Sequence, residues 1–283
     1  MATNFIKYKD KEPIILQRLD MIENMSEKLS PGFYSVEDVT GPFSPSIFGF
    51  TPIVLKENLI KFKTGTISQI MKKCTHFFSP ETKGIYENMG VSHKMAAVLY
   101  GPPGTGKTCT AQLIMSELSE KFDALCIDFT GYSANFIRKV CKEIRNIQDN
   151  PIVMFFDEAE KKLKEDEQNF LSFLDGIESV DNSIFLACTN FFNKIPKRIR
   201  ERRSRIKIAI EIKSLPTEIY EDYIKTKVPT LSHDQMKKFA FLAEDKCLTI
   251  DELKHAVIDF CVDGATMEDA IMEVKNYTEQ EDW

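Results

Sequence analysis

A glycine-rich loop is the stretch of this sequence with the clearest chemistry. Residues 101–108 fit the pattern G-x-x-x-x-G-K-[ST], whose backbone N–H groups surround nucleotide phosphates. The glycines leave no Cβ in the way, and a following helix N-terminus adds partial positive charge. We expect Lys107 to reach the β- and γ-phosphates and the Thr108 hydroxyl to bind Mg²⁺. The predicted nucleotide-binding residues are Gly101, Pro102, Pro103, Gly104, Thr105, Gly106, Lys107, Thr108 and Cys109.

Two adjacent carboxylates follow an apolar run further along the chain. Asp157 and Glu158 come directly after residues 152–156, and Asp157 lies 50 positions after Lys107. An Asp-Glu pair alone is usually a solvated surface feature, but the end of a buried strand is where a catalytic pair is expected. Asp157 would hold Mg²⁺ together with Thr108. If the strand continues, Glu158 points the other way, where it would polarise the attacking water near the γ-phosphate.

The elements that must position these residues form an alternating pattern. Continuously apolar strands between helices predict a parallel sheet covered on both faces, with catalytic residues at the carboxyl ends of its strands. Asn190 ends one such strand and would orient the same water as Glu158. The expected strands are 95–100, 124–129, 152–156, 184–188 and 206–212, and the expected helices are 108–122, 136–147 and 170–177.

Different patterns precede and follow this region. We interpret residues 1–65 as a leader, 66–212 as the nucleotide-binding domain, 213–277 as a helical lid and 278–283 as a frayed acidic tail. The leader is expected to hold a helix over 14–29, short strands or irregular structure over 33–52 and a strand over 54–62, before a helix over 67–78. It is either a packing arm over the core, which we favour, or an independent partner-binding domain. In the lid, the helix N-cap candidates are Thr217, Ser232, Thr249 and Thr266.

The overall composition narrows the functional class. The 283 residues carry a net charge of −6, which argues against a protein that coats nucleic acid with its whole surface. Seven cysteines without a C-x-x-C pair indicate reduced thiols and a reducing compartment. The sequence shows neither a membrane span nor a signal peptide. We therefore expect a cytoplasmic protein, in the host cytoplasm if the source is viral.

Taken together, these motifs resemble those of the AAA+ ATPases. Residues 101–108 match Walker A, 152–158 match Walker B, 171–176 resemble the "LL..LDG" helix end of the core AAA clade, and 184–190 resemble the sensor 1 strand with Asn190. The segment 85–101 is similar to the approach to Walker A in the mitochondrial respiratory-complex assembly ATPases and their bacterial and viral relatives. The resemblance implies a P-loop α/β fold, a three-layer αβα sandwich with a parallel sheet and a helical lid. It also implies ATP and Mg²⁺ as cofactors, with ATP bound between the subunits of a homo-oligomeric ring, commonly a hexamer.

A basic segment follows sensor 1 and holds candidates for a trans-acting arginine. Eight basic residues lie between Lys194 and Lys207. One alignment with the family suggests Arg202 and Arg205, and another suggests Arg200 and Arg202, so we favour Arg202. Two alternatives stay open for the segment: a solvated basic face, or a patch that binds nucleic-acid phosphates.

The sequence departs from the family in two places. The loop around Tyr132 is shorter than the aromatic pore loop of many unfoldases, so substrate threading is left open. No arginine stands near residues 248–250, where wider AAA+ members place sensor 2; Lys254 and His255 are substitutes or ordinary lid-surface residues.

From these features we expect an ATP-hydrolysing ring or partial ring that remodels a protein partner. A nucleic-acid-linked ATPase of clamp-loader or replication type is one alternative, supported by the basic segment. An oligomeric scaffold that holds ATP with little turnover is another, although the presence of Glu158 and Asn190 argues against it.

Overall fold

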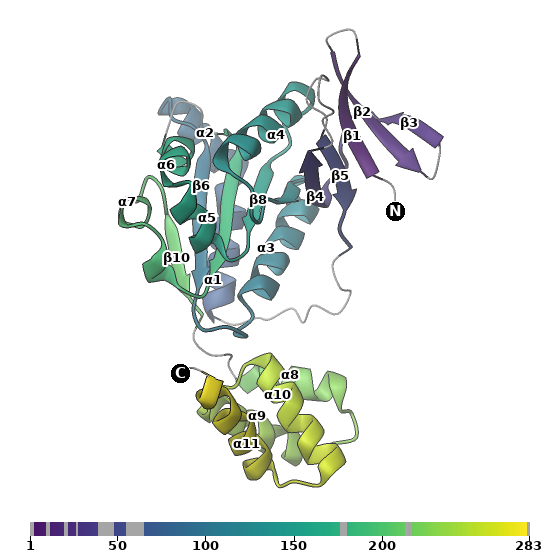
Figure 1. Ribbon diagram of the computed structural model, residues 1–283, viewed down its shortest axis with the longest axis vertical. Coiled ribbons are helices and arrows are strands. Elements are labelled where there is room, and N and C mark those ends of the chain that lie inside the picture. Colours follow the sequence, from purple (N-terminus) through teal and green to yellow (C-terminus); the bar gives the residue numbers. More distant parts are fainter. Residues whose placement is uncertain are drawn as a thin grey trace.

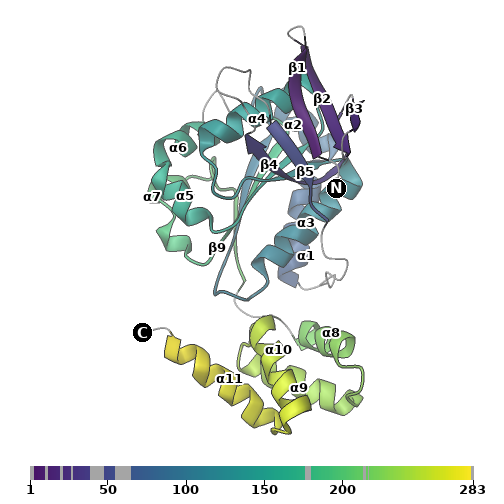
Figure 2. The ribbon, with the colours of Figure 1, turned by 45° about the vertical axis from the view of Figure 1, so that its right-hand side comes forward.

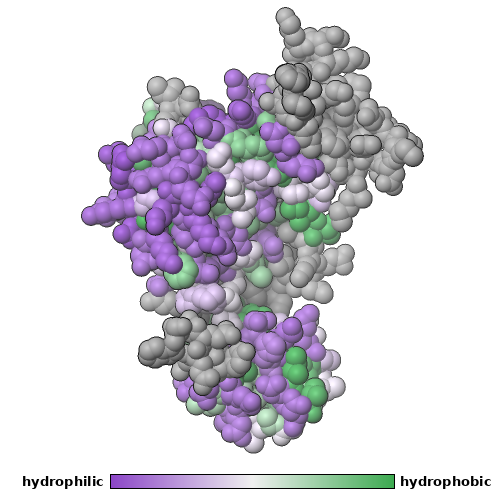
Figure 3. Space-filling view, in the orientation of Figure 1, coloured by the Kyte–Doolittle hydropathy of each residue, from purple (hydrophilic) through white to green (hydrophobic). Residues whose placement is uncertain are grey.

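The computed structural model consists of an α/β body followed by a helical bundle (Figure 1). It describes residues 3–9, 12–19, 22–26, 28–38, 48–54, 65–175, 180–212, 215 and 217–281. Figure 2 shows the bundle at the end of the body where the helix α3 (Lys107–Phe122) begins. Figure 3 shows a mostly hydrophilic face with hydrophobic side chains in small groups. Among the described residues, every helix is too short or too polar to span a bilayer.

One sheet runs through the α/β body in the order β10-β6-β9-β8-β7-β4-β5-β1-β2-β3. The strands from β10 to β4 are parallel to their neighbours, and the pairs from β4 to β3 are antiparallel. The predicted parallel sheet is thus confirmed. The strands are β1 (Thr3–Lys9), β2 (Glu12–Leu19), β3 (Ile22–Ser26), β4 (Gly32–Asp38), β5 (Phe48–Pro52), β6 (Lys94–Tyr100), β7 (Leu125–Asp128), β8 (Ile152–Phe156), β9 (Ser183–Thr189) and β10 (Ile208–Glu211).

Helices cover both faces of this sheet, as expected for a three-layer αβα sandwich. Buried side chains of α1 and α3 pack on one face, and those of α4, α5, α6 and α7 pack on the other. The middle strands consist mostly of apolar residues because both of their faces are covered. The helices are α1 (Gly65–Phe77), α2 (Pro80–Asn88), α3 (Lys107–Phe122), α4 (Ala134–Ile147), α5 (Ala159–Glu165), α6 (Glu167–Asp175) and α7 (Lys197–Arg200), with a 3₁₀ turn at Phe192–Lys194.

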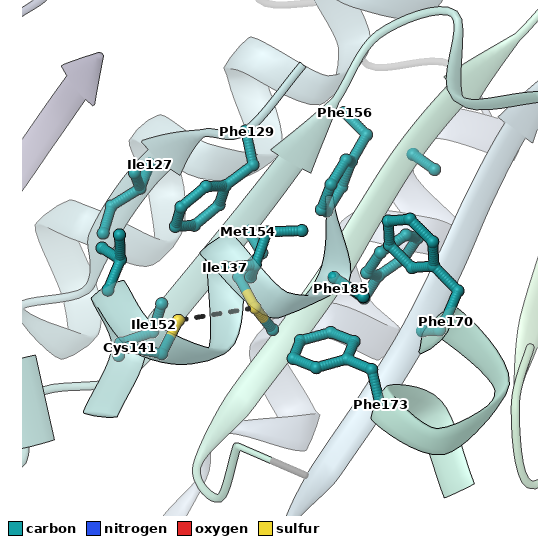
Figure 4. Packing of buried hydrophobic residues seen from close by; sticks show 14 of the residues in the cluster. Ile127, Phe129, Ile137, Cys141, Ile152, Met154, Phe156, Phe170, Phe173 and Phe185 are labelled. Atoms are coloured by element: carbon teal, nitrogen blue, oxygen red, sulfur yellow. Dashed lines mark hydrogen bonds between the residues drawn. The ribbon is translucent and has the colours of Figure 1, made fainter. Parts of the chain in front are cut away.

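An aromatic core fixes the strand that ends at the candidate carboxylates (Figure 4). The Phe156 ring stacks on Phe185 of the neighbouring strand, with centroids 4.2 Å apart. Below it, the Cys141 thiol donates to the Met154 sulfur at 3.8 Å. Such dense packing leaves little freedom to the end of β8, so Asp157 enters the site from a rigid support.

The C-terminal bundle has the capped helices that the sequence predicts. Ser232 and Thr249 each form a complete capping box, and Thr266 Oγ1 accepts from the Asp269 N–H at 3.1 Å. Thr217, in contrast, is the first residue of α8 rather than a cap. The helix α11 continues to Glu281, so it includes residues 278–281 of the predicted acidic tail. The elements are α8 (Thr217–Lys227), α9 (His233–Asp245), α10 (Ile250–Ile258), a π-helical turn at Asp259–Asp263 and α11 (Met267–Glu281).

The N-terminal segment differs most from its prediction. The helix expected over 14–29 is wrong, because β2 and β3 occupy this stretch and pair antiparallel. Of the two alternatives for residues 33–52, short strands or irregular structure, the structure has the short strands β4 and β5. Most of the strand expected over 54–62 lies outside the described residues. Since β4 pairs in parallel with β7, the leader continues the central sheet across the predicted boundary at residue 65.

A buried glutamine holds this segment to the core. Gln148, 4% exposed at the end of α4, accepts from the Leu29 N–H at 2.7 Å and donates to the Leu29 carbonyl at 3.2 Å. Both backbone groups of Leu29 are thereby satisfied just before β4 begins. This attachment supports the packing-arm interpretation over an independent domain.

Candidate nucleotide-binding site

The loop between β6 and α3 has glycines where other elements approach its backbone. Gly101 has φ 145°, and a Cβ there would lie 2.1 Å from the carbonyl oxygen of Ile212. Gly104 has φ 73°, and its Cβ would lie 2.6 Å from Thr249 Cβ at the start of α10. Any side chain at either position would push the loop away from β10 or from the bundle. The backbone therefore keeps its N–H groups beside the start of α3, as a phosphate site requires.

The ammonium of Lys107 lies inside the loop. Lys107 is 6% exposed, and its Nζ donates to the Pro102 carbonyl oxygen at 2.5 Å. Thr105 Oγ1 donates to the same oxygen at 2.9 Å. Burial lowers the pKa of Lys107, and nearby acidic groups that include Asp157 and Glu160 oppose this change. A nucleotide phosphate would give this buried cation a charged hydrogen-bond partner in place of the neutral Pro102 carbonyl.

Thr108 and Asp157 form a pair of oxygen ligands. The Thr108 hydroxyl donates to Asp157 Oδ2 at 2.9 Å, and the Asp157 N–H donates to Thr130 Oγ1 at 2.9 Å. A hydroxyl and a carboxylate are the hard oxygen donors that Mg²⁺ prefers, and Mg²⁺ usually takes its other ligands from water and phosphate. The pair therefore fits a nucleotide-bound Mg²⁺.

Glu158 lies differently from the expected continuation of β8. The strand ends at Phe156, and Glu158 adopts a left-handed conformation with φ 46° as the N-cap of α5. Its carboxylate accepts from Lys161 Nζ at 2.8 Å, and this hydrogen bond lowers the pKa of Glu158. The condition for Glu158 to point away from Asp157, a strand that continues through both residues, is thus not met. The side chain nevertheless stays at the mouth of the site, in its ionised form.

The candidate residues converge on one cavity of about 510 Å³. Its wall includes the loop, Asp157, Glu158 and Asn190, together with Cys109 at the start of α3. The bundle closes the other side, where the Ile250 N–H approaches the Gly104 carbonyl oxygen at 3.4 Å. Sequence reasoning missed these bundle residues, although the capping box at Thr249 marked the helix end that reaches the loop. They are Leu215, Tyr223, Ile250 and Asp251.

The three candidate arginines lie outside this cavity and differ in exposure. Arg205 is 9% exposed, and its Nε donates to Asp175 Oδ2 at 2.5 Å. The Arg202 side chain is 69% exposed, with Nη1 3.8 Å from the same carboxylate. Arg200 is half-buried, and its Nε has no partner among the described residues. Arg202 is thus the most available of the three to another molecule.

Tyr132 is engaged within its own subunit. Its hydroxyl donates to the Val36 carbonyl oxygen of β4 at 2.7 Å, and its ring stacks on Phe136 with centroids 4.3 Å apart. These contacts hold the side chain against the leader and do not support a role in a pore.

A strand, a glycine loop and a helix, with an acidic pair at the end of another parallel strand, define a P-loop α/β protein. The family model of the ATPase family associated with various cellular activities (AAA) matches residues 97–214. Residues 97–214 thus carry the AAA ATPase domain of this family.

Curated relatives are similar to the chain over part of their length. An "AAA ATPase forming ring-shaped complexes" from Bifidobacterium adolescentis is 27% identical over 208 residues, which cover 63% of this chain and 40% of the relative. A "Proteasome-associated ATPase" from Mycobacteroides abscessus is 25% identical over 214 residues, covering 62% and 35%. The matched segment is thus well under half of these relatives.

Proposed function

We propose that this protein binds ATP with Mg²⁺, hydrolyses it, and assembles into a ring or partial ring that remodels a protein partner. The convergence of Lys107, Thr108, Asp157, Glu158 and Asn190 on one cavity carries the proposal. Binding groups alone would suit a protein that only holds a nucleotide. A carboxylate and an amide beside them add what hydrolysis needs, a base and a group to orient water.

Each residue has a role that follows from its position. Lys107 would exchange the Pro102 carbonyl for phosphate oxygens of the nucleotide. Thr108 and Asp157 would hold Mg²⁺, which would supply positive charge beside the phosphates. Glu158 turns from Lys161 toward the attacking water and accepts its proton. Asn190 faces the same space from the end of β9 and fixes the direction of that water.

Assembly would complete this site. Among the residues that the structure describes, no arginine lines the cavity, and Arg202 is exposed on the segment after β9. A guanidinium from a neighbouring subunit would stabilise the charge that develops on the γ-phosphoryl group. The similarity to a ring-forming relative supports a homo-oligomeric ring, and we propose a hexamer. The buried free thiols of Cys74, Cys126, Cys141 and Cys188 suit the reducing cytoplasm.

The basic segment gives some support to a nucleic-acid-linked ATPase. Part of its charge is internal, however, since Arg205 pairs with Asp175 and also donates to the Arg198 carbonyl. We therefore keep protein remodelling as the main proposal.

Steady-state phosphate release tests the proposal, with Lys107→Ala as the background control. We expect Mg²⁺-dependent release by the wild-type protein and none above background by the variant. Stimulation by single- or double-stranded DNA would favour the nucleic-acid-linked alternative. Light scattering should show larger species with a slowly hydrolysed ATP analogue than without nucleotide, because ATP at a subunit interface stabilises that interface. If the wild-type protein binds ATP but releases no phosphate, the scaffold alternative is favoured over the ATPase.

A further inference from the structure

A buried hydrogen bond joins α5 to the end of β9 behind the wall of the nucleotide cavity. The Thr189 hydroxyl donates to Glu160 Oε2 at 2.5 Å, and the two residues are 1% and 5% exposed. A buried carboxylate is costly without compensation, and Glu160 has an electrostatic partner in the Lys107 ammonium. The pair is thus an internal part of the site.

The same hydroxyl oxygen fixes the turn that carries Asn190. The Phe191 N–H donates to Thr189 Oγ1 at 3.0 Å, so the residues on both sides of Asn190 are tied through one atom. A threonine hydroxyl has one proton and two lone pairs. Because the proton is directed to Glu160, a lone pair stays directed to the Phe191 amide. Without the carboxylate, the hydroxyl would be free to rotate and the turn would lose its fixed partner.

We propose that Glu160 is a positioning residue for Asn190 and acts through the Thr189 hydroxyl. This inference rests on the ATPase activity proposed above. The helix α5 begins at Ala159, directly after Glu158, so Glu160 belongs to the same short segment as the base. A shift of that segment, as Glu158 leaves Lys161 for the attacking water, moves Glu160 and with it the end of β9. The Glu158 carboxylate and the Asn190 amide, which act on the same water, are therefore positioned together.

Substitutions at Thr189 separate this role from packing. Thr189→Val removes the hydroxyl at nearly constant shape, whereas Thr189→Ser keeps it. We expect Thr189→Val to lower kcat by about 10–10²-fold, the cost of a small misplacement of a catalytic group, while the Kd of a fluorescent ATP analogue stays near the wild-type value. Thr189→Ser should retain most of the wild-type kcat, and Glu160→Gln should fall between the two. Equal kcat for Thr189→Val and wild type overturns the proposal.

A double-mutant cycle tests whether the effect passes through Asn190. If Thr189 acts by positioning Asn190, then Thr189→Val lowers kcat little further once Asn190→Ala is present. If the two losses multiply instead, Thr189 supports the fold in general and the proposal is wrong.

Amide hydrogen exchange gives a measurement that needs no turnover. The Phe191 amide should exchange faster in Thr189→Val and in Glu160→Gln, while the amides of the 101–108 loop keep their wild-type rates. Unchanged Phe191 exchange in both variants contradicts the link. If the wild-type protein releases no phosphate, the proposed function fails, but this exchange measurement still decides whether Glu160 holds the Asn190 turn.

Discussion

The Glu158 carboxylate and the Lys161 ammonium lie 2.8 Å apart across the first turn of α5. Both side chains are exposed, at 59% and 72%. The base proposed for hydrolysis is thus paired with a cation of its own helix and must leave it before it can act.

Lys161→Ala should raise basal phosphate release, because Glu158 no longer has to leave an ion pair. Exposed pairs at this spacing are weak, so the increase should be roughly twofold. Lys162→Ala is the matched control, since Lys162 pairs with Glu165 on the same helix at 3.2 Å. A decrease in turnover for Lys161→Ala alone would instead make Lys161 a positive contributor to the site.

Glu158→Gln should keep nucleotide binding and lose turnover. Lys107, Thr108 and Asp157 remain to hold the nucleotide and its metal, whereas the amide cannot accept a proton from water. Turnover should fall by roughly 10²–10⁴-fold. Nucleotide affinity and phosphate release measured on the same preparation check this. Normal hydrolysis by this variant would exclude Glu158 as the base.

Arg202→Ala should bind ATP normally yet hydrolyse little, because the site that Arg202 completes belongs to a neighbour. The loss of such an arginine costs roughly 10³–10⁵ in rate. Mixing Arg202→Ala with Lys107→Ala subunits tests action in trans, since some junctions then hold an intact loop and an intact arginine. Two nearly inactive preparations should regain activity, with a maximum at an intermediate ratio. If co-assembled rings stay inactive at every ratio, Arg202 is not the trans-acting arginine. The role would then belong to Arg200 or Arg205, or the segment would be a solvated basic face.

Arg205→Ala should mainly lower stability. Its guanidinium is nearly buried and holds Asp175 at 2.5 Å, so truncation leaves a partly desolvated carboxylate and an unpaired Arg198 carbonyl. We expect a loss of roughly 1–3 kcal/mol in urea unfolding. Arg202→Ala is the internal comparison, because its exposed contact at 3.8 Å should change stability by less than about 0.5 kcal/mol. Equal losses for the two variants would contradict this division between a structural and an exposed arginine.

Gln148→Ala should loosen the N-terminal strands. It removes both hydrogen bonds to the Leu29 backbone and leaves buried polar groups unpaired, at a cost of roughly 1–3 kcal/mol. Amide exchange should accelerate first in β4. Asn146→Ala is the control. Asn146 is exposed on the same helix, and its side chain donates a hydrogen bond to Glu143. Unchanged exchange in β4 would mean that strand pairing with β7 alone holds the segment.

The sequence predicts the central fold and the binding loop well because both depend on local signals. Apolar strands, the glycine pattern and the capping boxes each involve residues close in sequence. The helix expected over 14–29 is wrong because the spacing of Ile15, Leu19 and Ile22 also fits strands, and the deciding partner is distant: β1 pairs along β2, with Phe5 opposite Leu16.

The details of the candidate site depend on turns that the sequence pattern does not specify. The left-handed conformation at Glu158 ends β8 and brings Lys161 into reach. The bond between Glu160 and Thr189 joins positions 29 residues apart. The different exposure of Arg202 and Arg205 follows from one carboxylate, Asp175, at the end of another helix. Each of these three features depends on tertiary packing rather than on residue spacing.

The parallel pairing of β4 with β7 has a consequence for any shortened form of this protein. In the full chain β7 has a neighbour on each side, β8 and β4. A chain that begins after residue 54 would leave one side of β7 with free backbone donors and acceptors, a template for strand addition between molecules. Such a truncated protein would self-associate through sheet edges without nucleotide. Large particles in its light scattering would then report aggregation rather than a ring.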